Sequence, residues 1–138
     1  MIIDNFLKMA DAITVGSSTA AVITTSYVDT IAEADDYAGC FIVHHAETAI
    51  LSGTAAATVN FKLQHCDTTV ASAFTDLVTS GEIDDALVVA GYMSAIRIPP
   101  TGVKRYIRGA IITSQVTTSG TVSTFITKDI DINMQLVA

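Results

Sequence analysis

The clearest pattern in the chain is a strict alternation of apolar and polar residues between positions 59 and 65. Val59, Phe61, Leu63 and His65 fall on one side of an extended backbone, and the polar residues between them fall on the other. A period of two residues is typical of a β-strand that has one face buried and one face in water. This segment therefore predicts a strand of an antiparallel sheet.

Further short strands are predicted along the rest of the chain. Met93–Ile98 alternates in the same way, and Ala86–Ala90 is a continuous apolar run of the kind found inside a sandwich. Turn residues follow several of these segments, among them Pro99–Gly102, where proline removes a backbone donor. Thr117–Gly120 predicts a hairpin connection between the last two strands. The remaining predicted strands are Ile13–Val15, Ala20–Thr25, Cys40–His45, Lys104–Ser114 and Thr121–Thr127.

These segments amount to seven to nine short strands, with turns about every 8–12 residues, which is typical of a β-sandwich or β-barrel. The segment 73–83 is weakly patterned and is interpreted as a short strand and a turn. No long helix is predicted, so we expect residues 1–138 to form a single all-β domain.

Three other segments are interpreted as non-core. Residues 1–12 carry the apolar side chains of Ile2, Ile3, Phe6 and Leu7 and are expected to form a turn of helix or an extended N-terminal arm. Residues 27–37 are acidic and are expected to form a surface loop. Residues 129–138 are expected to form a C-terminal arm.

The composition excludes several classes of protein. Half of the 138 residues are apolar and 15% are charged, so the chain is not of the disordered class. The net charge of −7 argues against a nucleic-acid binder, because phosphate contacts require clustered Lys and Arg. The sequence has no 18-residue apolar run and no signal-peptide pattern, so we expect neither a membrane partner nor secretion.

A metal site is the first chemistry to consider, because Cys40, His44, His65 and Cys66 fall on two predicted strands. His44 and His45 are adjacent and face opposite sides of a strand, as do His65 and Cys66, which spoils a tetrahedral ligand set. We therefore predict ordinary packing for these side chains and no metal. Whether Cys40 and Cys66 pair is left open by the sequence.

Catalytic motifs are also missing from the sequence. The acidic pairs Asp35–Asp36 and Asp84–Asp85 are expected in solvated turns, and they lack the regular spacing of a calcium loop. The chain has no Gly-x-Ser-x-Gly elbow, no P-loop and no dinucleotide fingerprint. We therefore expect a protein that is not an enzyme and binds no cofactor.

One charged feature stands out in this acidic chain. Four of its seven basic residues lie within twelve positions, on both sides of the Pro99–Gly102 turn, with Tyr92 and Tyr106 nearby. This cluster is either a solvated edge with ion pairs to the chain's own acids, or a polar anchor for an acidic partner surface. The four residues are Arg97, Lys104, Arg105 and Arg108.

The same stretch resembles a known family. Ala90–Tyr92 together with Ile96–Arg108 is similar to the core motif of the Bbp16-type capsid cement proteins of tailed bacteriophages, most specifically at Lys104–Arg108. The opening residues from Ile3 to Ile23, and a middle segment from Leu63 to Ser80, resemble the same family. The similarity extends from about residue 2 to residue 127; the longer acidic loop at 27–37 and the tail at 129–138 depart from the pattern.

The resemblance implies a jelly-roll-type antiparallel β-sandwich that binds the outer surface of an assembled capsid. The implied partners are the major capsid protein of an HK97-fold shell and further copies of the chain, as a homodimer or homotrimer. The implied location is the capsid exterior, after synthesis in the host cytoplasm. The residues that we expect to contact the capsid or another copy are Ile2, Ile3, Phe6, Leu7, Tyr92, Arg97, Lys104, Arg105, Tyr106 and Arg108.

Two other functions remain open at this point. Another virion β-module, associated with a tail or fibre, would share the all-β composition but would be present in far fewer copies per particle. A carbohydrate-binding jelly roll would be expected to expose aromatic platforms, for which a chain with four Tyr and no Trp is poorly equipped.

Overall fold

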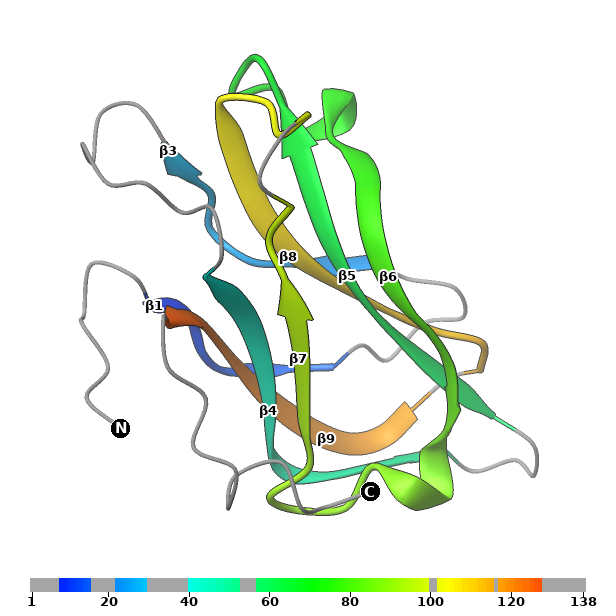
Figure 1. Ribbon diagram of the computed structural model, residues 1–138. Helices are drawn as coiled ribbons and strands as arrows, with labels where there is room; N and C mark the ends of the chain where they lie inside the picture. Colours follow the sequence, from blue (N-terminus) through cyan, green and yellow to red (C-terminus); the bar gives the residue numbers. More distant parts are fainter. Residues whose placement is uncertain are drawn as a thin grey trace.

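The computed structural model describes residues 8–15, 22–29, 40–52, 57–99, 102–115 and 117–127 of the 138-residue chain. In these ranges nine β-strands form, together with two single-turn 3-10 helices (Figure 1). The strands are β1 (Lys8–Thr14), β2 (Val22–Thr24), β3 (Val28–Asp29), β4 (Phe41–Ser52), β5 (Thr58–Cys66), β6 (Thr75–Asp84), β7 (Met93–Arg97), β8 (Tyr106–Thr113) and β9 (Thr117–Thr127). The helices are η2 (Ala71–Ala73) and η3 (Asp85–Leu87).

The strands form two antiparallel sheets that pack face to face. Sheet A has the order β1-β9-β4-β7, and sheet B has the order β2-β8-β5-β6, with the short β3 also paired to β8. Apart from β3 and the β5–β6 pair, the chain crosses to the opposite sheet between successive strands. Eight strands interleaved in this way are the jelly-roll arrangement. The prediction of an all-β, jelly-roll-type antiparallel sandwich is confirmed.

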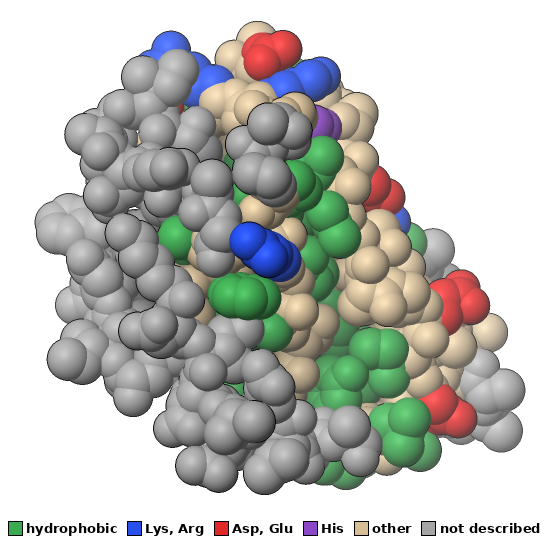
Figure 2. All heavy atoms as spheres, in the orientation of Figure 1, with side chains coloured by type: hydrophobic (Ala, Val, Ile, Leu, Met, Phe, Trp, Pro, Cys, Tyr) green, Lys and Arg blue, Asp and Glu red, His purple; other side chains and the backbone are tan. Residues whose placement is uncertain are grey.

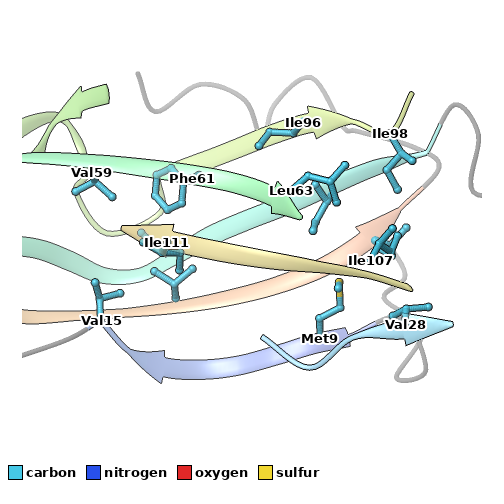
Figure 3. Close-up of a cluster of buried hydrophobic side chains, with 14 of the residues drawn as sticks. Met9, Val15, Val28, Val59, Phe61, Leu63, Ile96, Ile98, Ile107 and Ile111 are labelled. Carbon is cyan, nitrogen blue, oxygen red and sulfur yellow. The ribbon is translucent and has the colours of Figure 1, made fainter. Parts of the chain in front are cut away.

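The core lies between the two sheets and contains the alternating side chains that first predicted a strand. Val59, Phe61 and Leu63 on β5 are all buried, and they face apolar side chains from sheet A such as Ile96 and Met9 (Figure 3). Each such side chain contributes about 1.5–3 kcal/mol when fully removed from water. The period-two interpretation of this segment is therefore confirmed.

A histidine lies inside this core and connects the sheets. His44 on β4 is fully buried; its Nδ1 accepts from the Thr124 hydroxyl on β9 at 2.9 Å, and its Nε2 donates to the Lys62 carbonyl on β5 at 3.1 Å. Its ring stacks on Phe61 with 5.3 Å between centroids. Gly109 leaves room for the ring, because a Cβ there would lie 2.6 Å from His44 Cε1. Burial lowers the pKa of His44 to about 4, so the imidazole is neutral at pH 7.

Two irregularities interrupt β6, which lies at one edge of sheet B. Ser80 and Gly81 together stand opposite Phe61 of β5, between the pairs Asn60–Glu82 and Lys62–Thr79, so β6 carries one extra residue there; a second extra residue, Leu77, falls between the pairs Leu63–Val78 and Gln64–Asp76. Gly81 has φ +80°, a conformation that favours glycine, and the Phe61 amide donates to Ser80 Oγ at 3.1 Å. The strand therefore bends at this bulge, and a side chain replaces one bond of the β5–β6 ladder.

The expectation for residues 1–12 was wrong from Lys8 onwards. Residues 8–14 form β1, which pairs with β9, and Met9 is buried in the core. Register shifts flank Ala10, and Ala12 has φ 48° with its amide donating to Ser123 Oγ. These bulges break the two-residue period, which is why the pattern predicted a strand only from Ile13 onwards. Residues 1–7 lie outside the described residues.

The apolar run 86–90 was also misinterpreted, because it does not form a strand. Asp84 caps η3 by accepting from the Ala86 amide at 3.0 Å, and the chain then turns towards β7. Val88 is the only fully buried member of the run, whereas Leu87 and Val89 are 52% and 44% exposed. Apolar composition alone did not distinguish this helical turn from an interior strand.

The hairpin predicted at Thr117–Gly120 is wrong for a topological reason. These residues begin β9, and β8 and β9 belong to different sheets, so the connection between them crosses the sandwich. Thr117 donates to the Val15 carbonyl at 2.7 Å. A Cβ at Gly120 would lie 2.9 Å from Ile50 Cγ1, so the absence of a side chain at Gly120 permits close packing on β4.

The other segment predictions were partly correct. The strand expected at Cys40–His45 continues to Ser52, and the weak segment 73–83 contains a full strand, β6. The expected acidic loop 27–37 begins instead with β3, and its residues 30–37, like the C-terminal arm 129–138, lie outside the described residues. Cys40 and Cys66 are both buried, and no disulfide joins them.

Candidate functional site

The structure brings together three of the four basic residues that the sequence singled out. Lys104, Arg105 and Arg108 lie at the beginning of β8 in sheet B, and Arg97 lies at the end of β7 in sheet A. Figure 2 shows Lys and Arg side chains at the end of the sandwich where β8 begins, and a further basic side chain lower on the same face. The candidate site is therefore built around the start of β8.

Arg105 is held by an acidic residue of its own chain. Its Nε and Nη2 donate to the two carboxylate oxygens of Asp29 on β3, at 3.0 and 2.8 Å. Its guanidinium carbon also lies 5.0 Å from the centre of the Tyr106 ring. The hydrogen bonds to Asp29 raise the pKa of Arg105 above its ordinary value, so the guanidinium is charged. The Asp29 carboxylate fixes its orientation and balances its positive charge.

Arg108 is anchored more deeply than Arg105. Its guanidinium carbon lies 4.1 Å from the centre of the Phe74 ring, and its Nη2 donates to the Ala71 carbonyl in η2 at 3.1 Å. Its Nε donates to Gln64 Oε1 at 2.9 Å. Partial burial lowers the pKa of Arg108 below its ordinary value. This side chain therefore fixes η2 and Phe74 against sheet B.

The contact to Gln64 continues across the sheet. Gln64 Nε2 donates to Asp76 Oδ1 at 2.9 Å, and Lys62 Nζ lies 2.7 Å from the other carboxylate oxygen of Asp76. Hydrogen bonds from Lys62 and Gln64 lower the pKa of Asp76, although burial alone would raise it. This chain of polar contacts explains why Gln64 is buried even though it lies on the outward face of β5.

Aromatic side chains complete this end of the molecule. The Tyr27 ring lies 5.4 Å from that of Tyr106 in an edge-on arrangement and 6.5 Å from that of Phe74. Tyr27 is 48% exposed, and Val70, which precedes η2, is 55% exposed. We call the group formed by Tyr27, Val70, Arg105, Tyr106 and Arg108 the aromatic–arginine surface.

Sequence reasoning identified three members of this surface and missed two. Arg105, Tyr106 and Arg108 were found because they are neighbours in the sequence. Tyr27 and Val70 come from distant segments, and the position of Tyr27 just before an acidic stretch was the only local signal for it.

The other predicted contact residues are not counted in this surface. Tyr92 is half-buried and stacks on Phe61, with 6.1 Å between ring centroids, and burial raises the pKa of its phenol. Lys104 is exposed at the turn before β8. Ile2, Ile3, Phe6 and Leu7 lie outside the described residues.

The residues considered as metal ligands are used in packing. His44 bonds across the core, and His65 Nδ1 accepts from the Lys104 amide at 3.2 Å, with burial lowering the pKa of His65. Hydrogen bonds from Thr68 lower the pKa of the Cys66 thiol. In the described ranges no three His, Cys, Asp or Glu side chains gather in a way that could hold a metal ion.

These observations define an antiparallel jelly-roll sandwich, one end of which presents aromatic rings and oriented guanidinium groups on a rigid base. Residues 8–126 match the sequence model of the Bbp16 family, so the chain belongs to this phage-associated family. A search among curated proteins gave no match. No helix in the described part of the chain has the length and apolar character needed to cross a membrane.

Proposed function

We propose that this chain is a virion structural protein that binds the outer surface of an assembled phage capsid. In this proposal it stabilises the shell by bridging subunits of the major capsid protein, and it associates with further copies of itself. The observation that carries the proposal is the Bbp16 match over residues 8–126, which covers nearly all of the described sandwich. The role is adhesion, for which shape and a few anchoring side chains suffice.

The aromatic–arginine surface is the part of the sandwich best suited to the capsid contact. Tyrosine and arginine are enriched at the energetic centres of protein interfaces, because both offer a large flat surface with polar groups at the edge. Here the two arginines are already held in place by Asp29 and Gln64, so little side-chain freedom is lost on binding. Since Asp29 neutralises Arg105, we expect packing and hydrogen bonding, rather than net charge, to dominate the contact.

The N-terminal residues continue from a point close to this surface. The Ser26 amide donates to the Met9 carbonyl at 3.1 Å, which places the start of β1 beside the residue that precedes Tyr27. Residues 1–7, with the apolar side chains of Ile2, Ile3, Phe6 and Leu7, follow directly from there. The proposal therefore assigns the arm and the aromatic–arginine surface to one continuous contact.

The stabilisation would follow from mass action. A module that binds the assembled shell, and not its separated subunits, stabilises the shell by its own binding free energy. Many copies that each touch two neighbouring subunits add avidity where the geometry allows simultaneous contact.

Co-sedimentation of the purified protein with empty, expanded capsid shells tests the proposal. Val70→Asp places a charge on the aromatic–arginine surface, and Val89→Asp makes the same change at a similarly exposed valine beyond η3, at the opposite end of the sandwich (Figure 1). We expect the wild type and Val89→Asp to sediment with shells and to raise the temperature at which the shells dissociate. We expect Val70→Asp to bind at least about tenfold more weakly, the effect of losing about 1.4 kcal/mol.

Two results would contradict the proposal. Failure of the wild-type protein to bind shells at any stage of expansion would remove the capsid role altogether. Equal binding by Val70→Asp and the wild type would leave the capsid role in place but would show that the aromatic–arginine surface is not the contact.

A further inference from the structure

The sandwich has an open side where β6, at one edge of sheet B, lies beside β7, at one edge of sheet A. β6 pairs with β5 and β7 pairs with β4, and in the part of the chain that the structure describes no strand lies on the other side of either. An open groove of about 480 Å³ runs between them. Its lining includes the apolar side chains of Val78, Ile83, Tyr92 and Ile96, and Figure 2 shows hydrophobic side chains exposed along this side of the molecule.

β7 is the better of the two edges for pairing with another strand. β6 is bent by its bulge at Ser80–Gly81, whereas β7 pairs with β4 without a register shift from Met93 to Arg97. Ser94 and Ile96 are buried and point inwards, while Ala95 and Arg97 are exposed. A strand added here would complete a regular ladder if it carried apolar residues opposite the inward positions.

The last residues of the sequence have this pattern. After Lys128, polar and apolar residues alternate strictly for eight positions. The alternation gives the segment one apolar and one polar face in an extended conformation. The apolar positions are Ile130, Ile132, Met134 and Leu136, and the polar positions are Asp129, Asp131, Asn133 and Gln135.

The segment starts close enough to reach the edge. Thr127, Phe41 and Arg97 lie side by side on β9, β4 and β7. With about 4.8 Å between strands, the far side of β7 is about 14 Å from Thr127. Five extended residues span about 17 Å, so residues 128–132 suffice for the crossing and residues 133–138 remain for pairing. Because β9 and β7 run in the same direction, a chain that turns back after Thr127 meets β7 antiparallel.

We propose that residues 133–138 add to the free edge of β7 in the same molecule, as a fifth strand of sheet A. Met134 and Leu136 then cover the groove beside Ile96, and Asn133 and Gln135 face the solvent. Asp131 comes next to the exposed Arg97, so opposite charges attract where residues 128–132 cross to β7. The occupant of the groove is thus the chain's own C-terminal segment.

Amide hydrogen exchange of the full-length protein tests this proposal. The double variant M134D/L136D places two charges on the apolar face, and N133D/Q135E adds the same charge to the polar face of the same segment. We expect the β7 amides that do not bond to β4 to be protected in the wild type and in N133D/Q135E. In M134D/L136D we expect them to exchange at least about tenfold faster, while the amides of β5 and β8 are unchanged.

Each alternative outcome would overturn the proposal. Equal β7 exchange in M134D/L136D and the wild type would show that the segment does not pair there. Protection that falls when the protein is diluted tenfold would show that the strand comes from a second copy. Faster exchange in both double variants would show a general effect of charge and not loss of an apolar contact. None of these outcomes bears on capsid binding, which is measured separately.

Discussion

Replacing His44 by glutamine should reduce the dependence of stability on pH. Glutamine retains an amide that can donate to the Lys62 carbonyl, but it does not titrate. In the native chain, the unfolded state takes up a proton near pH 6.5, whereas the buried imidazole does so only near its pKa of about 4. The unfolded state therefore binds more protons as the pH falls between these values, so stability is lost on acidification.

The size of this effect follows from the two pKa values. Between about pH 7 and pH 5 a single such histidine removes about 2 kcal/mol of unfolding free energy, and well below pH 4 the total approaches about 3 kcal/mol. Urea denaturation followed by far-UV circular dichroism at the two pH values measures this difference directly. At pH 7 we expect H44Q to be less stable by about 1–2 kcal/mol, because its bond to Thr124 is lost.

The decisive quantity is the loss of unfolding free energy between pH 7 and pH 5, compared between the wild type and H44Q. His65, whose pKa is also lowered by burial, is present in both proteins and cancels from the comparison. H45Q is the matched control, because it removes a half-exposed imidazole from the outward face of the same strand. If the wild type and H44Q lose the same free energy between pH 7 and pH 5, the argument that His44 is held neutral by the core is refuted.

Three further substitutions test packing and hydrogen bonding. Gly109→Ala should lower stability by about 1–3 kcal/mol, because the new methyl group would overlap the His44 ring; an unchanged melting temperature would contradict this. Arg108→Lys should speed proteolysis near η2, because lysine cannot reproduce the flat stack on Phe74 or the forked hydrogen bonds, and wild-type cleavage rates would argue against that role. Ser80→Ala should cost about 1 kcal/mol in urea denaturation, since the β5 amide opposite the bulge loses its acceptor; no measurable cost would mean that water replaces it.

The sequence predicted most clearly the strands in which buried positions alternate with more exposed ones over several residues. β5 and β7 each have one face in the core, so their residues alternate and the period of two is visible. Only the end of β1 was predicted, as the strand Ile13–Val15, because bulges interrupt the alternation before Ile13. The run 86–90 was mistaken for a strand because apolar composition does not reveal which of its side chains the fold leaves exposed.

The candidate site was predicted only as far as neighbours in the sequence could reveal it. Arg105, Tyr106 and Arg108 share the start of one strand, so their proximity was evident. Arg97 is also close in the sequence, but the chain changes sheets between β7 and β8 and separates it from the others. Tyr27 lies in the site because the neighbouring strand β3 pairs with β8, and no local sequence pattern predicts that pairing.

The bulge in β6 has a consequence for crowded conditions. A straight edge strand offers a template on which a second molecule can continue the ladder, and this can propagate into fibrils. At Ser80–Gly81 the backbone turns away from such a path, so two molecules that meet at this edge cannot stay in register beyond a few residues. Many copies can thus be packed at high local density without fusing their sheets along β6.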